Sequence, residues 1–154
     1  MQTVRDGDGE TYLLVKHSAE SSRVRDPATG EERYVDNDRL SVVDGESPLA
    51  TAASGVPEPV RRTLGAVRDD RSLGLLAVVV DEGPIAAIDL LDAADMCESD
   101  LHGALSEFRA AGLVAEAEVA GRRGYEATAV AEEALRLLRG GSADEGAVGE
   151  GDGD

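Results

Sequence analysis

The sequence predicts an α+β chain, in which a small N-terminal antiparallel β-sheet is followed by a helical domain that contains one β-hairpin. Residues 1–45 hold short runs rich in Val, Leu, Tyr and Thr, separated by turn-forming residues. Beyond residue 57 the apolar residues recur at helical spacing, and over 114–128 they alternate again with polar ones. A chain of 154 residues has room for one ordinary domain, or for a small domain with an accessory piece.

The N-terminal sheet is expected from four strand-like runs, over residues 11–16, 22–25, 32–35 and 40–43. Asp6-Gly7-Asp8-Gly9 precedes the first of these runs and indicates a turn. Between the second and third runs lies Asp26-Pro27-Ala28-Thr29-Gly30. There, proline presets its own φ angle and glycine can take the left-handed conformation that closes a hairpin. Residues 1–45 are therefore predicted to form a small β-hairpin domain.

Residues 46–57 are predicted to be a linker, because Pro48, Gly55 and Pro57 interrupt this stretch, although 49–53 could form one helical turn. The second domain is then expected over 58–139. After it, Gly occupies six of the fifteen positions of 140–154, which also carry five acidic residues and no basic one. Such a segment buries too little apolar surface to offset its chain entropy, so a disordered acidic tail is expected.

Three helices are expected at the start of the second domain, beginning at Pro59, at Arg71 and at Pro84, with the second ending at Gly83. Their apolar residues recur every three or four positions, which predicts one inward face on each helix. The inward residues expected are Val60, Leu64 and Val67 on the first, Leu73, Leu76, Ala77 and Val80 on the second, and Ile85, Ile88 and Leu91 on the third.

A fourth helix is expected over 99–111. Ser99 is a good N-cap residue, since its side-chain oxygen can accept a hydrogen bond from a free amide of the first turn. Leu101, Leu105 and Phe108 form an i, i+4, i+7 stripe, and Gly112 is placed to end the helix in a left-handed conformation.

A two-stranded hairpin is expected over 114–128, because Ala and Val alternate with Glu up to the segment 121–124, which is predicted to be its tip. Thr128 is then expected to cap a last helix. The inward residues expected on that helix are Val130, Ala134, Leu137 and Leu138.

This order of elements over residues 71–138 resembles the winged helix-turn-helix regulators of the ArsR and MarR type. The resemblance covers about half of the chain, and its most specific part is the exit from the fourth helix through Ala-Gly-Leu-Val into a hairpin of suitable length. The segments that carry it are Asp70-Arg71-Ser72-Leu73, Gly83-Pro84, Ser99-Asp100-Leu101-His102, Phe108-Arg109-Ala110-Ala111-Gly112-Leu113-Val114 and Gly121-Arg122-Arg123-Gly124-Tyr125-Glu126-Ala127-Thr128.

The resemblance implies a DNA-binding transcription regulator whose helix 99–111 lies in the major groove of double-stranded DNA, while the wing reaches the backbone or the minor groove. On the helix, the outward residues are small or polar and can approach base edges. Arg122 and Arg123 of the wing can pair with phosphates. The expected DNA-binding residues are Ser99, His102, Gly103, Ser106, Arg109, Arg122 and Arg123. A homodimer is compatible with this interpretation, and the oligomeric state is left open.

The charge balance keeps a second interpretation open. The chain has 32 acidic and 15 basic residues, for a net charge of −17, and this composition resembles that of proteins from extreme halophiles. In molar potassium salt, repulsion between carboxylates is screened over roughly 3 Å. Helix 99–111 nevertheless carries only one basic residue, Arg109, and Glu98, Asp100 and Glu107 would repel phosphates at low salt. The alternative is a winged helix that serves as a protein-interaction module in transcription or replication machinery.

Other classes of function are not supported by the sequence. We find no nucleophile elbow, phosphate-binding loop or His-containing triad, so an enzyme is not expected. Cys97 is the only cysteine, and His17 and His102 are the only histidines, so neither a metal site nor another cofactor is predicted. Tyr12 and Tyr34 alone offer stacking surfaces for RNA on the N-terminal sheet. With no apolar segment long enough to span a bilayer, a cytoplasmic protein without membrane contact is expected.

Overall fold

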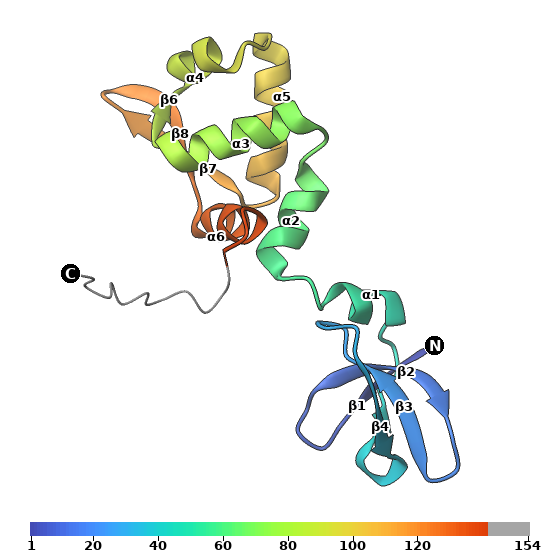
Figure 1. Ribbon diagram of the computed structural model, residues 1–154. Coiled ribbons are helices and arrows are strands. Elements are labelled where there is room, and N and C mark those ends of the chain that lie inside the picture. The colour runs from blue at the N-terminus through green and yellow to red at the C-terminus, as the bar shows by residue number, and fades with distance from the viewer. Residues whose placement is uncertain (142–154) are drawn as a thin grey trace, which may run out of the picture. The chain divides into compact units, whose positions relative to one another are not determined.

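The computed structural model describes residues 1–141 and shows an α+β chain made of two compact units, Met1–Glu58 and a second unit that begins at Pro59 (Figure 1). We call them unit 1 and unit 2. Unit 1 is built around a five-stranded sheet, and unit 2 combines helices with a three-stranded sheet. The last residues of the expected acidic tail, 142–154, lie outside the described part of the chain.

The sheet of unit 1 is an antiparallel meander whose fifth strand returns beside the first, in the order β4-β3-β2-β1-β5. The four expected strands are present, and a short 3-10 helix, Asn37–Arg39, leads into the last of them. The first strand was not expected, because its four residues include only one large apolar side chain. The strands are β1 (Gln2–Arg5), β2 (Thr11–His17), β3 (Ser21–Arg25), β4 (Glu32–Asp36) and β5 (Ser41–Val42).

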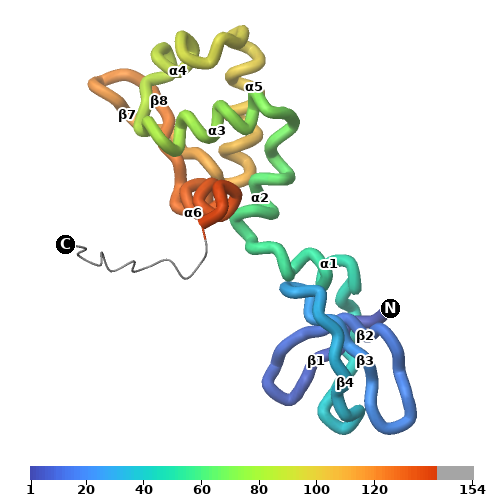
Figure 2. The backbone as a smooth tube through the Cα atoms, viewed as in Figure 1, coloured from blue at the N-terminus to red at the C-terminus, as the bar shows by residue number. Residues whose placement is uncertain are grey.

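One face of this sheet carries a small apolar core. Its buried residues are Val4, Tyr12, Val24 and Val35, and Leu14 and Leu40 pack against them. Alternation along the strands places these residues on one side, whereas their sequence neighbours point to the other side. The close turns between the strands can be followed in the backbone trace (Figure 2).

The stretch 46–57, which was predicted to be a linker, contains a helix that packs on the sheet. Helix α1 (Pro48–Ala53) begins after Ser47, whose hydroxyl accepts hydrogen bonds from the amides of its first turn. Thr51 is buried, and its hydroxyl lies 2.6 Å from that of Thr3 on β1. Pro48 at the start of the helix and the alanines that follow explain why this short segment is helical. The linker prediction is therefore wrong for 48–53.

Unit 2 folds around a larger apolar core, to which every one of its major elements contributes. Phe108, Leu76, Leu90, Leu105 and Leu113 are its largest fully buried side chains. The elements follow one another in the order α2 (Glu58–Ala66), α3 (Asp70–Glu82), β6 (Ile85–Ala86), α4 (Ala87–Ala94), α5 (Glu98–Ala110), β7 (Val114–Val119), β8 (Arg122–Ala127) and α6 (Ala129–Leu138).

Helices α2 and α3 occur where they were expected, but their buried faces are rotated from the predicted ones. Leu64 is 64% exposed, while Thr63 and Ala66 are buried beside Val60. On α3 the buried residues are Ser72, Leu75, Leu76 and Val79. Runs of consecutive apolar residues such as 75–80 fit more than one helical phase, so periodicity could not select the inward face.

The prediction of a helix beginning at Pro84 is wrong, because Ile85 and Ala86 form the strand β6, and the helix α4 begins only at Ala87. Strand β6 pairs with β8, so the sheet has the order β6-β8-β7. Ile88, expected inward, is 54% exposed, and Leu90 is the buried residue of α4. Two residues are too few to show a strand period, and only pairing with a distant strand identifies them.

The last helix is capped as predicted: the Thr128 hydroxyl accepts a hydrogen bond from the Ala131 amide. Its buried residues are Ala131, Ala134 and Leu135, whereas Leu138 is 46% exposed. The predicted inward face was therefore correct at Ala134 and wrong at Leu138. The Gly140 and Gly141 amides donate to carbonyl groups of the final turn, which ends the helix.

Candidate nucleic-acid interface

Helix α5 has one buried face and one exposed face, as the sequence predicted. Leu101, Leu105 and Phe108 are 3%, 1% and 0% exposed and belong to the core of unit 2. Because these three residues hold one side of the helix against the core, the residues between them must point outward. The exposed residues include Ser99, His102, Gly103, Ser106 and Arg109, which are the five predicted on this helix.

The two ends of α5 differ in how well they were predicted. Cys97 is the N-cap residue and makes no side-chain capping bond, so Ser99 lies inside the first turn and the N-cap prediction is wrong. Glu98 and Asp100 occupy that turn, where the positive end of the helix dipole favours acidic residues. At the other end, Gly112 has φ of 75°, and the Leu113 amide donates to the Phe108 carbonyl at 2.8 Å. This is the left-handed glycine ending expected from the sequence.

The hairpin over 114–128 is present, but its tip is two residues long. Ala120 and Gly121 both have positive φ, of 51° and 77°, as a tight two-residue turn requires. Arg122 and Arg123 therefore belong to strand β8, opposite Val119 and Glu118 of β7. The prediction of a tip over 121–124 is therefore wrong, and Gly124 lies within strand β8. A Cβ atom at Gly124 would lie 2.4 Å from the Ile85 carbonyl oxygen, so this glycine permits β6 to pair with β8.

The predicted site residues do not form one continuous cluster: six of them line three separate shallow depressions around α5, and Arg122 lines none of these three. His102 and Arg123 share one depression with apolar residues of α4 and with Tyr125. Ser99 and Gly103 line a second depression, against the α2–α3 connection. Ser106 and Arg109 line a third, beside β7. His102 of α5 and Arg123 of β8 therefore border the same depression.

Two of the predicted side chains on α5 already lie beside carboxylates. The Nη1 atom of Arg109 lies 3.3 Å from a carboxylate oxygen of Glu116 on β7. His102 lies 3.6 Å from the carboxylate of Glu98, one turn earlier on the same helix. By contrast, Arg122 and Arg123 are exposed and form no ion pair within residues 1–141. Among the predicted cations, these two are the ones available to an external anion.

Two further arginines lie beside α5 and were not predicted. Arg68 and Arg71 come from the start of α3 and the residues before it, and they line the same depression as Ser99 and Gly103. Arg68 pairs with Glu107 of α5, and Arg71 donates a hydrogen bond to the Asp95 carbonyl at 2.8 Å. A helix beginning at Arg71 was expected, but nothing in the sequence indicates that its start packs beside a helix about thirty residues later.

Within the described residues, no group of three or more His, Cys, Asp or Glu side chains is arranged to hold a metal ion. Cys97 is exposed, and its sulfur lies 3.4 Å from the Ser99 hydroxyl. None of the helices formed by residues 1–141 combines the length and the apolar character that crossing a bilayer requires.

A model of the family DUF7346, described as a family of unknown function, matches residues 1–139 and so spans both units. No curated protein matches the chain. Among solved structures, the chain is similar to the crystal structure of NolR from Sinorhizobium fredii, with 23% sequence identity and a TM-score of 0.46. That match covers 65% of this chain and all of the NolR chain.

Proposed function

The chain belongs to the DUF7346 family, and we propose that its unit 2 is a winged helix-turn-helix that binds duplex DNA as a transcription regulator. In this proposal α5 lies in the major groove, and the β7–β8 hairpin is the wing that contacts the backbone. The protein is a binding protein rather than an enzyme, and it acts in a cytoplasm of molar potassium salt.

The observation that carries the proposal is the character of the exposed face of α5. It presents Ser99, His102, Gly103 and Ser106, which are small or polar. Strand β8 carries two exposed arginines, of which Arg123 borders the same depression as His102. Serine and histidine can exchange hydrogen bonds with base edges, and glycine permits a close approach. Arg122 and Arg123 supply the unpaired positive charge that a phosphate backbone needs.

The net charge of the chain does not prevent this contact at high salt. Electrostatic interactions between exposed charges are screened beyond roughly 3 Å at 1 M salt, so remote carboxylates repel DNA only weakly. An ion pair formed at contact distance is screened less. Because few phosphates are neutralised, few counterions are released, and the affinity should fall only slowly as salt rises.

The test is a binding measurement with fluorescently labelled genomic duplexes in about 1–2 M KCl. Wild type should bind an operator, and Arg122→Ala/Arg123→Ala should weaken binding to every duplex by roughly 1–3 kcal/mol without loss of fold. Arg136→Ala/Arg139→Ala is the matched control, because it removes two positive charges at the end of α6, where Arg136 pairs with Glu133 and Arg139 with Asp81. Equal weakening by both double variants would contradict the phosphate contact at the wing.

A second function, docking to another protein, is favoured by the charge count around α5. The elements α5, β7 and β8 together carry six carboxylates and three guanidinium groups. Ile88 is also 54% exposed at the edge of the depression that contains His102 and Arg123. If wild type binds no genomic duplex in molar salt, while Ile88→Glu abolishes association with a transcription or replication protein, docking replaces DNA binding.

A further inference from the structure

The outer side of the unit 1 sheet, opposite the small core, carries a row of polar side chains across three adjacent strands. Helix α1 packs on this same side at Thr3 of β1, next to the row. A register shift between Leu14 and Lys16 of β2 brings Lys16 opposite Arg23 of β3, and Arg23 lies opposite Tyr34 of β4. Neighbouring strands are about 4.8 Å apart, so the row extends over roughly 10 Å. In the adjoining row, Arg25 of β3 lies opposite Glu32 of β4.

These side chains point away from the small core. Val24 lies between Arg23 and Arg25, and Val35 follows Tyr34; both valines are buried on the inner face. Alternation along a strand therefore directs the arginines and the tyrosine outward. Tyr34 is 64% exposed, in contrast to Tyr12, which is 8% exposed. We call the four residues Lys16, Arg23, Arg25 and Tyr34 the cationic sheet face.

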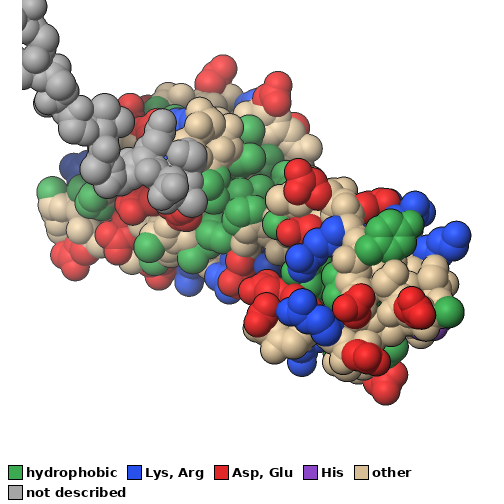
Figure 3. Space-filling model, turned by 60° about the horizontal axis from the view of Figure 1, so that its bottom comes forward, with side chains coloured by type: hydrophobic (Ala, Val, Ile, Leu, Met, Phe, Trp, Pro, Cys, Tyr) green, Lys and Arg blue, Asp and Glu red, His purple; other side chains and the backbone are tan. Residues whose placement is uncertain are grey.

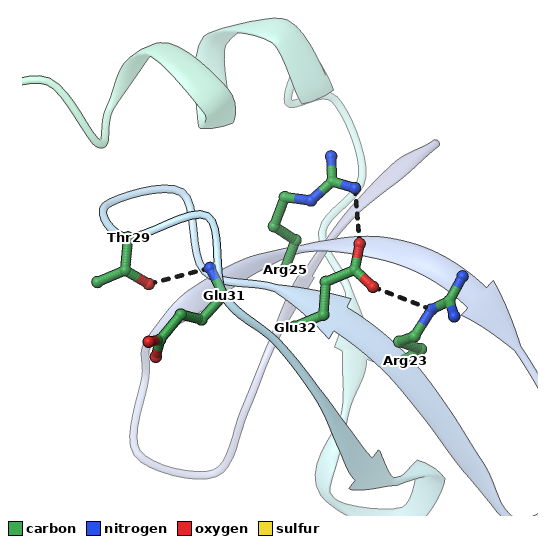
Figure 4. A network of polar contacts seen from close by, with 5 residues as sticks. All are labelled: Arg23, Arg25, Thr29, Glu31 and Glu32. Atoms are coloured by element: carbon green, nitrogen blue, oxygen red, sulfur yellow. Dashed lines mark hydrogen bonds and ion pairs between the residues drawn. The ribbon is translucent and has the colours of Figure 1, made fainter.

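The cationic sheet face carries a net positive charge, although two of its arginines form ion pairs with one carboxylate. Figure 4 shows the Glu32 carboxylate between two guanidinium groups, 2.7 Å from Arg25 and 3.3 Å from Arg23. The hydrogen bond from Arg25 lowers the pKa of Glu32, so this carboxylate stays ionised. One carboxylate thus pairs with two guanidinium groups. Because side chains alternate between the two faces along a strand, Arg5 of β1 and Asp36 of β4 also lie on this side of the sheet.

The sign of the charge here is opposite to that of the chain as a whole. The outer side of the sheet carries Arg5, Lys16, Arg23 and Arg25 against Glu32 and Asp36, whereas the chain has 32 acidic and 15 basic residues. Lys16 is also the only lysine of the chain. In the space-filling view, basic and acidic side chains are interspersed over the unit at the right (Figure 3).

We propose that the cationic sheet face contacts the phosphate backbone of the same duplex DNA that unit 2 binds. The inference rests on the proposed function and adds a second, sequence-independent contact to it. Lysine and arginine can pair with phosphate oxygens, and the exposed tyrosine hydroxyl can donate a hydrogen bond to one. A row of donors on a sheet suits a polymer with regularly repeated anions. Because both units belong to one chain, the second contact is intramolecular, which raises the overall affinity without further sequence preference.

The first experiment compares two double variants of the full chain in duplex binding. Lys16→Ala/Arg23→Ala removes two charges from the cationic sheet face. Arg33→Ala/Arg39→Ala removes two charges from elsewhere in unit 1, since Arg33 lies on the Tyr12 side of the sheet and Arg39 in the 3-10 helix. The first variant should weaken binding to all duplexes about tenfold and make the salt slope shallower by about two. The control should change neither, and thermal melting verifies that both variants fold. Equal weakening by both would overturn the proposal.

The second experiment locates the contact directly. Backbone amide resonances of the full chain are followed as an unrelated duplex is added, and shifts are expected both in β2–β4 and in α5 with β8. Shifts confined to α5 and β8 would overturn the sheet contact and leave the proposed function standing. Shifts confined to β2–β4 would support the sheet contact and contradict the proposed role of α5. Two further ligands serve as controls. If polyglutamate shifts the β2–β4 resonances with the same affinity as the duplex, the face binds acidic protein segments and the proposal is overturned. Tighter binding of a single-stranded oligonucleotide to β2–β4 would also overturn it.

Discussion

The two units of the chain are stabilised in different ways. The core cluster of unit 1 consists of four buried apolar residues, whereas the core cluster of unit 2 contains thirteen. Unit 1 compensates with buried polar side chains: Thr3, Ser22 and Thr51 are 1%, 1% and 5% exposed. The Ser22 hydroxyl donates to the Asn37 side chain at 2.6 Å, and Thr3 and Thr51 share a hydrogen bond. Small domains bury a smaller fraction of their surface, so directional hydrogen bonds carry more of their specificity.

This difference indicates where each unit is vulnerable. Unit 2 should lose most when a large apolar side chain is shortened, because a cavity then opens among closely packed neighbours. Unit 1 should lose most when one member of a buried polar pair is removed, because the remaining member loses its partner.

Phe108→Ala should reduce the free energy of unfolding of unit 2 by about 3–5 kcal/mol, because Phe108 is fully buried at the centre of its core. Urea unfolding in molar salt, followed by amide hydrogen exchange to resolve the two units, measures this loss. Leu64→Ala is the control: its side chain is 64% exposed, so a change within about 0.5 kcal/mol is expected. A similar loss for both variants would contradict the core assigned to unit 2.

Gly124→Ala should destabilise unit 2 by about 1–3 kcal/mol. The added Cβ atom would lie 2.4 Å from the Ile85 carbonyl oxygen and 2.9 Å from a Val119 methyl carbon, so β6 and β8 would have to separate. Gly74→Ala is the matched control. A Cβ atom there meets nothing within 4 Å, and alanine in a helix interior should stabilise by roughly 0.5–1 kcal/mol. Thermal melting distinguishes the two signs, and a neutral Gly124→Ala would show that β6 does not pair closely with β8.

Thr51→Val should cost unit 1 about 1–3 kcal/mol, because it leaves the buried Thr3 hydroxyl without its partner. Thr3→Val should cost less, because the Thr51 hydroxyl can still donate to the Ser47 carbonyl. The double variant removes both polar groups at nearly constant volume, so it should cost less than the two single variants added together. A double-mutant cycle on the unfolding free energy measures the coupling. Strictly additive losses would mean that this hydrogen bond does not couple α1 to the sheet.

The smallest expected effect is on the pH dependence of the unfolding free energy of unit 2, through the surface carboxylate of Asp81. The hydrogen bonds from Arg139 to Asp81 lower the pKa of Asp81 below its ordinary value of 3.8. A carboxyl group whose pKa is lower in the folded state contributes stability above the unfolded pKa, and that stability is lost as the pH falls through the folded value. Below about pH 4, wild type should therefore lose more stability than Asp81→Asn does. Parallel curves of unfolding free energy against pH would contradict the contribution of this pair.

The sequence predicted the features that depend on neighbours along the chain. The Leu101, Leu105 and Phe108 stripe, the Gly112 helix end and the Thr128 cap are all present, because each is a local geometric requirement. The strands of unit 1 were predicted for the same reason, apart from β1. A four-residue strand is recognised only through its partners, and β1 pairs with β2 and β5.

The features that depend on distant contacts were predicted less well. By sequence pattern alone, Ile85 and Ala86 fit the start of a helix, and only their pairing with β8 identifies them as a strand. Likewise, residues 48–53 fit a linker, and only the contact between Thr51 and Thr3 shows that they pack on the sheet. At the candidate site, the exposure of the α5 residues followed from its apolar stripe. The ion pair between Arg109 and Glu116 and the arginines before α5 could not be foreseen, because they join segments whose proximity only the fold determines.

The central claim, that α5 recognises duplex DNA, is tested most directly by selecting preferred sequences from a random duplex pool in about 1–2 M KCl. Wild type should enrich a defined sequence, and His102→Ala or Ser106→Ala should change the preference at a few adjacent base pairs while the remainder of the sequence is kept. Enrichment of the same sequence by wild type and by both variants, or no enrichment by wild type, would contradict the claim.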